Sequence, residues 1–207
     1  MKNLIPFSVF FILLLSSLSY AQCDTSFTVS IKPGAEFDFC IKKDGDIISE
    51  ISYKVRTEAN TLTTPPKIEF TEDDYVHYLE FEDYNFDGYL DMYAHDPCMI
   101  LGNCFGKVYL FKNAEFVHEP QLDDLTTVTP DPNTKTIFSS NRSAAGALFT
   151  NETFKWEGDK LILIKRVSQD YAPGYDSQMF LYKVEERDAD GNMVVTKQEY
   201  VQEPYLE

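Results

Sequence analysis

Turn-forming residues interrupt the chain at short intervals, and little of the sequence between them has helical periodicity. Near the N-terminus, residues 35–43 precede Asp44-Gly45 and residues 46–57 follow it, with apolar and polar residues alternating from Ile51 onward. Side chains of a strand point to opposite faces in turn, and Asp-Gly is a favoured two-residue turn between paired strands. The sequence therefore predicts an antiparallel β-hairpin in this region.

Three further hairpins are predicted by the same reasoning, each with Asn or Gly in its turn. The paired segments are 107–111 with 115–118, 153–156 with 161–165, and 179–186 with 193–200. Residues 61–66 form a polar connection that contains two prolines. Sixteen Phe and thirteen Tyr supply the large side chains that fill a sheet core. We predict an all-β fold of successive antiparallel hairpins, arranged as a sandwich or as a propeller-like single domain over residues 22–207.

One segment carries more oxygen donors than a turn requires. Side-chain oxygens stand at loop positions 1, 3, 5 and 9, and a main-chain carbonyl is available at position 7; the five residues are Asp83, Asn85, Asp87, Asp91 and Tyr89. Gly88 occupies position 6, where the backbone of a calcium loop turns sharply. The set contains no soft ligand and suits a hard cation. The sequence therefore predicts that these five residues bind one Ca²⁺, in a structural role.

This loop departs from a helix-flanked calcium loop in two ways. Position 12 is Ala94 instead of a bidentate Glu, so affinity is expected in the weaker range of about 10⁻⁴ to 10⁻³ M. Further candidate oxygens are those of Glu80, Glu82 and Asp96. The alternating residues 75–81 predict a strand before the loop, and the residues after it predict another. A plain hairpin turn at Asp87-Gly88 is the alternative interpretation.

The N-terminus has the pattern of an export signal. Lys2 is followed by an apolar stretch over residues 5–15, and Ser19-Tyr20-Ala21 places small residues where a signal peptidase reads them. We predict cleavage after residue 21 and a periplasmic or extracellular location. The stretch is too short to span a membrane, and no later segment qualifies. Lipidation at Cys23 is the alternative, but Gln22 is a poor residue before a lipidated cysteine.

The four cysteines are Cys23, Cys40, Cys98 and Cys104. An exported chain is expected to form two disulfides from them, and three pairings are possible. The short spacing of the last two favours a local bridge, which leaves Cys23 to pair with Cys40. A zinc site or a thiol nucleophile would instead need free sulfur beside histidine.

Acidic residues dominate the composition, with 34 Asp and Glu against 18 Lys and Arg and a formal charge of −16. No Lys or Arg occurs between Lys67 and Lys107, an interval that contains ten Asp and Glu residues. Such a surface disfavours nucleic acid as a partner, and it would attract cations and a basic protein.

Several segments together resemble a known family. They are the loop 83–91, the strand 107–111 with Phe116 after its turn, the segment 137–140 (Ile-Phe-Ser-Ser), and 154–161 (Phe-Lys-Trp-Glu-Gly-Asp-Lys-Leu). The chain is similar here to periplasmic calcium-binding proteins that protect certain Gram-negative bacteria from a type IV secreted peptidoglycan hydrolase. Those proteins resemble inhibitors of invertebrate-type lysozymes. The resemblance covers about residues 75–166, and it implies an all-β protein that binds one calcium and inserts loops into the cleft of a muramidase.

Under this resemblance the inserting segment is predicted at Ser139, Ser140, Asn141, Arg142 and Ser143, read as a loop between two strands. Its hydroxyls, amide and guanidinium would donate to the paired carboxyl groups of a glycoside hydrolase. Lysozyme inhibitors often have a Ser-Gly-x-x-Tyr-like loop, whereas here Ala144 follows Ser143 and the next aromatic residue is Phe149.

We therefore predict a non-catalytic, exported, calcium-binding inhibitor of a peptidoglycan hydrolase, or of another basic protein. The alternative is a periplasmic or surface scaffold or adhesion module that calcium stiffens. A hydrolase has less support, because His77, His95 and His118 have no paired nucleophile at a recognisable spacing.

Overall fold

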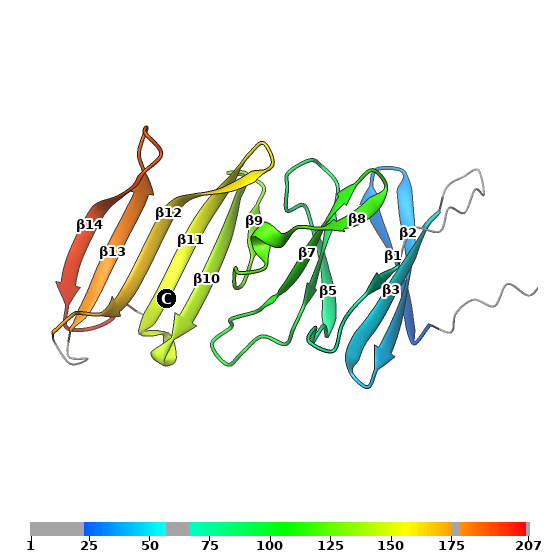
Figure 1. The fold of residues 1–207 in the computed structure, drawn as a ribbon, viewed down its shortest axis with the longest axis horizontal. Coiled ribbons are helices and arrows are strands. Elements are labelled where there is room, and N and C mark those ends of the chain that lie inside the picture. Colours follow the sequence, from blue (N-terminus) through cyan, green and yellow to red (C-terminus); the bar gives the residue numbers. More distant parts are fainter. Residues whose placement is uncertain (1–22, 57–66, 175–178, 206–207) are drawn as a thin grey trace, which may run out of the picture.

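The computed structural model describes residues 23–56, 67–174 and 179–205, which form antiparallel strands almost throughout (Figure 1). The strands make three sheets that follow one another along the chain, so the predicted all-β fold is confirmed. The predicted export signal and the predicted connection 61–66 lie outside the described residues. Within the described ranges, no helix has the length and apolar character needed to cross a bilayer.

The N-terminal sheet has the strand order β1-β2-β3-β4. Its strands are β1 (Thr25–Lys32), β2 (Ala35–Asp44), β3 (Ile47–Arg56) and β4 (Ile68–Glu69). The predicted hairpin is confirmed, because β2 and β3 pair antiparallel. Its turn lies one residue later than predicted, at Gly45-Asp46, since Asp44 still pairs with Ile47. On β2, alternate residues Phe37, Phe39 and Ile41 are buried, which gives this sheet one apolar face.

The central sheet has the order β5-β6-β7-β8. Its strands are β5 (Tyr78–Glu82), β6 (Asp91–His95), β7 (Gly106–Lys112) and β8 (Glu115–His118). The predicted strand–loop–strand arrangement around residues 83–90 is therefore confirmed. Asn113 and Ala114, with φ of 52° and 69°, connect β7 to β8 in the left-handed conformation that matches the twist of paired strands.

The C-terminal sheet has the order β14-β13-β12-β11-β10-β9. Its strands are β9 (Thr129–Asp131), β10 (Thr136–Ser143), β11 (Leu148–Glu157), β12 (Lys160–Tyr171), β13 (Phe180–Arg187) and β14 (Met193–Val201). The two predicted hairpins in this region are both present. Two short 3-10 helices, η1 (Pro120–Leu122) and η2 (Ala144–Gly146), precede β9 and β11.

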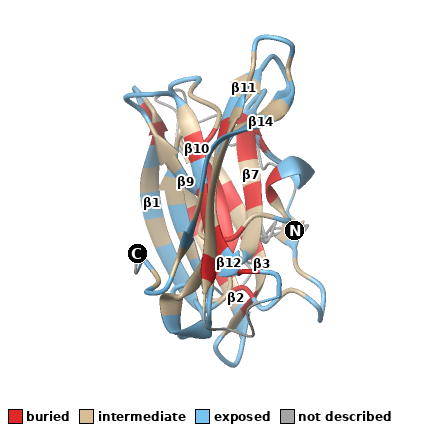
Figure 2. Cartoon of the chain, turned by 90° about the vertical axis from the view of Figure 1, so that its left-hand side faces the viewer, coloured by how far each residue is buried: buried red, intermediate tan, exposed pale blue. Residues whose placement is uncertain are grey.

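The central sheet is covered on both faces. All five residues of β6 are buried. Met92 and Ala94 belong to the core shared with the N-terminal sheet, whereas Tyr93 belongs to the core shared with Ile137 and Phe154 of the C-terminal sheet. Figure 1 shows the sheets in chain order along the long axis, and Figure 2 shows buried positions on strands such as β7. The fold is thus a stack of three sheets with two cores.

Two disulfides are present, Cys23–Cys40 and Cys98–Cys104, and they confirm the favoured pairing. No described cysteine is free. The first bridge ties the start of the described chain to β2, and the second closes a short loop between β6 and β7. Two structural disulfides are compatible with an exported protein.

Candidate functional site

The loop 83–90 connects β5 to β6, and its side chains hold its own backbone in a turn. Asp83 accepts hydrogen bonds from the amides of Asp87 (3.1 Å) and Gly88 (2.9 Å). Asn85 Oδ1 accepts from the same Asp87 amide at 3.0 Å. The side-chain oxygens of Asp83 and Asn85 therefore converge on one point of the turn. Gly88, with φ of 89°, allows the sharp reversal that brings them together.

Asp87 completes this turn from the other side. Its Oδ1 accepts from the amide of Tyr89 at 2.9 Å, and its Oδ2 accepts from Asn85 Nδ2 at 3.0 Å. Asp87 is exposed, whereas Asp83 and Asn85 are half-buried. The loop thus contains several side-chain oxygen atoms that each accept a hydrogen bond from a neighbouring donor.

Asp91 lies beneath the loop and is fully buried. Its Oδ2 accepts from the amide of Tyr84 at 2.8 Å, and its Oδ1 accepts from the amide of Phe111 on β7 at 2.7 Å. Burial raises the pKa of Asp91 to about 7, against the lowering effect of these two hydrogen bonds. The charges of Asp87 and Asp83 also raise it. This carboxyl group therefore fixes the end of the loop to the neighbouring strand.

The donor set fits a hard cation. Each carboxylate oxygen retains a lone pair after accepting one hydrogen bond, so Asp83, Asn85, Asp87 and the carbonyl of Tyr89 could all face an ion. Among the described residues, no group of three or more His, Cys, Asp or Glu side chains is gathered as a metal site. The loop would accordingly rely on two carboxylates, one amide oxygen and one carbonyl. Coordination by Asp91 stays a prediction.

The further oxygens suggested by the sequence lie in different places. Glu82 is opposite Asp91 in the β5–β6 register. Glu80 lies 3.5 Å from His95 Nε2. Asp96 follows the opposite end of β6, about 16 Å along the strand from Asp91 at roughly 3.3 Å per residue, so it cannot join the loop as a ligand.

The loop also joins all three sheets. Leu90 donates its amide to the carbonyl of Ile31 on β1 at 2.8 Å. Trp156 Nε1 on β11 donates to the carbonyl of Tyr84 at 2.9 Å, and the Tyr84 ring is buried in the second core. Ordering of residues 83–90 would therefore also order the hydrogen bonds that link this loop to β1 and β11. The hydrogen bond from Trp156 to this loop was not predicted from the sequence, because the two residues are 72 positions apart in the chain.

The predicted inserting segment is not a loop. Ser139 to Ser143 belong to β10, which pairs with β9 and β11. Ser139 and Ser140 are each 4% exposed. The hydroxyl of Ser139 donates to the carbonyl of Thr126, and that of Ser140 donates to Asn151 Oδ1. These two hydroxyls are therefore structural and cannot reach a partner, which corrects the prediction.

The other three residues of the segment lie at the end of β10. Asn141 and Ser143 are exposed, and Arg142 is half-buried. The Asn103 side chain makes two hydrogen bonds with the backbone of Arg142. It donates to the Arg142 carbonyl at 2.7 Å and accepts from the Arg142 amide at 2.8 Å. A partner contact by these three residues stays a prediction.

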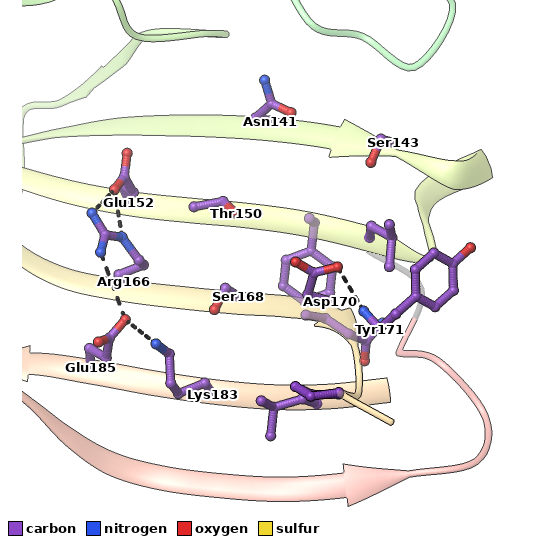
Figure 3. Close-up of a pocket in the computed structure, with 15 residues that line it drawn as sticks. Asn141, Ser143, Thr150, Glu152, Arg166, Ser168, Asp170, Tyr171, Lys183 and Glu185 are labelled. Carbon is purple, nitrogen blue, oxygen red and sulfur yellow. Dashed lines mark hydrogen bonds and ion pairs between the residues drawn. The ribbon is translucent and has the colours of Figure 1, made fainter. Parts of the chain in front are cut away.

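A polar groove of about 600 Å³ lies on the C-terminal sheet beyond the apolar core (Figure 3). The register places Asn141, Thr150, Ser168 and Lys183 in one row across four strands. A parallel row contains Glu152, Arg166 and Glu185.

The charges in this groove pair with one another. Arg166 lies 2.7 Å from Glu152 and 3.8 Å from Glu185, and Lys183 lies 3.1 Å from Glu185. Neither His nor Cys occurs among the described residues that line it. The groove therefore offers hydrogen bonds to a polar ligand.

No protein family and no curated protein matches the sequence. A solved structure of a Xanthomonas type IV secretion system related protein is similar to this chain, with a TM-score of 0.51 and 16% sequence identity. The match covers 83% of this chain and 93% of that protein. At this identity the likeness concerns the fold alone.

Proposed function

We propose that this chain is an exported, calcium-binding, non-catalytic protein that inhibits a lysozyme-like peptidoglycan hydrolase. The observation that carries the proposal is the oxygen-donor loop 83–91, which lies at the junction of three sheets. Its residues are part of the sequence resemblance to calcium-binding inhibitors of type IV secreted hydrolases. The fold likeness to a type IV secretion system related protein supports the same direction.

Calcium would supply positive charge within a loop that carries three carboxylates. Asp83, Asn85, Asp87, Tyr89 and Asp91 would hold it, and Asp91 would also anchor the loop from below. The ion would thereby lower the electrostatic cost of crowding these anions. Because Leu90 and Tyr84 connect the loop to β1 and β11, its binding would stiffen the whole stack.

A stiff and acidic scaffold suits an inhibitor of a basic enzyme. Little conformational entropy is lost when a rigid surface binds, and the excess of Asp and Glu speeds encounter with a positively charged partner. Asn141, Arg142 and Ser143 are the remaining predicted contact residues, at the end of β10.

The test is a titration of the purified mature protein against muramidases of several classes, among them an invertebrate-type lysozyme and a secreted bacterial muramidase. We expect stoichiometric inhibition of at least one enzyme, with weaker inhibition at high salt because charge attraction is screened. Absence of both inhibition and complex formation across the panel would contradict the proposal and favour a scaffold role.

A further inference from the structure

The disulfide loop between Cys98 and Cys104 exposes apolar side chains at its tip. Ile100 is fully exposed, and Met99 is 62% exposed. Large apolar side chains that project together into solvent are unfavourable for solubility, and they often mark a binding surface. Neither side chain belongs to either core.

This loop is held in one shape by its own bonds. The disulfide closes the ring. Within it, the amide of Met99 donates to the carbonyl of Asn103 at 2.9 Å, and the amide of Gly102 donates to the carbonyl of Met99 at 2.8 Å. Gly102, with φ of 80°, supplies the left-handed turn that this closure requires.

The base of the loop is attached to the body of the protein. Asn103 is bonded to the backbone of Arg142 on β10, as described above. Thr127 Oγ1 donates to the carbonyl of Gly102 at 2.8 Å, and the Thr127 amide donates to the carbonyl of Cys104 at 2.8 Å. The apolar tip is therefore presented by a preformed platform, and fixing it in a complex would cost little entropy.

An aromatic residue and charged groups of both signs lie at the base of the loop. Tyr78, which is partly exposed, places its hydroxyl 3.3 Å from Cys98 Sγ. Asp96 precedes the ring, and the charged groups near its carboxylate include Asp74, His77 and Lys107. The ring itself contains no charged residue. An apolar tip with charged side chains at its base is complementary to an apolar pocket with a polar rim.

We propose that the loop 98–104 is the principal binding loop of this protein, and that Met99 and Ile100 enter an apolar pocket with a polar rim at the active-site cleft of its target. This inference rests on the proposed function, because it takes the target to be the inhibited hydrolase. It assigns the insertion to a segment different from 139–143. The two segments adjoin, since Asn103 contacts Arg142, so the end of β10 lies at the margin of the same surface.

The test compares Ile100→Asp with Val117→Asp, a matched control on β8 whose side chain is 46% exposed. Each variant is titrated against the enzyme that the wild type inhibits most strongly in the muramidase panel. We expect Ile100→Asp to raise the inhibition constant at least 50-fold, because a charge would enter an apolar pocket, and Val117→Asp to change it less than threefold. Both melting temperatures should match the wild type, since neither side chain is in a core.

A second variant tests the contribution of preorganisation. Cys98→Ser/Cys104→Ser keeps both apolar side chains but opens the ring, and we expect about tenfold weaker inhibition. Inhibition by Ile100→Asp at wild-type strength would overturn the loop assignment while leaving the proposed function intact. An Ile100-dependent dimer would also overturn it, because the tip would then be covered by a second copy. No inhibition by the wild type would overturn the proposed function and this inference together.

Discussion

The loops at the two ends of β6 use opposite means to hold their shape. Residues 83–90 turn polar side chains inward onto their own amides and connect all three sheets. Residues 98–104 are closed by a covalent bond and turn apolar side chains outward. The first arrangement depends on charge compensation and serves the scaffold. The second is rigid without any ion, so its side chains are free for a partner.

The largest effect is expected at the polar end, from Asp91→Ala. It leaves the buried amides of Tyr84 and Phe111 without acceptors, and each such loss costs about 1–3 kcal/mol. We expect the free energy of unfolding to fall by about 3 kcal/mol or more. Urea denaturation in excess chelator measures it without a contribution from calcium. Asp83→Ala, at a half-buried position that water reaches, should cost less; equal losses would contradict the structural role of Asp91.

Calcium should stabilise the protein through the same end. At about a hundredfold excess over its dissociation constant, an ion that binds only the folded state adds about 2.7 kcal/mol. The melting temperature should therefore rise with calcium and fall with EGTA. Asp87→Ala should abolish this response, and Cys98→Ser/Cys104→Ser should keep it. A calcium response that required the disulfide would show that the two ends are not independent.

Opening the disulfide loop should have a somewhat smaller effect on stability. Closing a ring of this size removes unfolded-state entropy worth about 2 kcal/mol at 25 °C. We expect Cys98→Ser/Cys104→Ser to lower the free energy of unfolding by about that amount, with calcium affinity unchanged in a calorimetric titration. A loss of calcium binding in this variant would remove the distinction between the two loops.

The smallest effects are expected at the glycines that turn each loop. A Cβ at Gly88 or Gly102 would meet no atom within 4 Å, so Ala there carries only the cost of a left-handed backbone, about 1–2 kcal/mol. Gly106, at the start of β7, is the contrast. Its Cβ would collide with the backbone of Ala94 and His95, so Gly106→Ala should lower the melting temperature further than either. Equal shifts for all three would contradict the close approach of β6 and β7.

Local sequence signals predicted the parts of the fold that are local. The Asn113-Ala114 turn lies between paired strands as expected, and the first hairpin turns one residue later than expected, at Gly45-Asp46. Both hairpins could be predicted because a two-residue turn fixes the register of its own hairpin. The strand β1 was not predicted, although Gly34 marks the turn that pairs it with β2. The stacking order of the sheets could not be read from periodicity, since it depends on which apolar faces meet.

The errors at the candidate site concern partners distant in sequence. Ser139 and Ser140 are residue types common in loops, but here they lie in a strand, and their hydroxyls donate hydrogen bonds to the Thr126 carbonyl and to Asn151 Oδ1. Ile100, within the apolar run Met99-Ile100-Leu101, would be expected inside the protein. Its exposure follows from the ring closed by Cys98 and Cys104 and from the anchoring of Asn103, contacts that no local pattern encodes.

The central claim, that calcium orders the loop 83–91 at the junction of the sheets, can be tested with the protein's single tryptophan. Trp156 Nε1 donates to the Tyr84 carbonyl inside this loop, so its fluorescence reports the state of the loop directly. We predict a saturable change of emission on calcium titration, half-complete at about 10⁻⁴ to 10⁻³ M, reversed by EGTA and absent in Asp87→Ala. An emission spectrum that stays constant to 10-fold beyond this range, with no heat in a parallel calorimetric titration, would contradict the account.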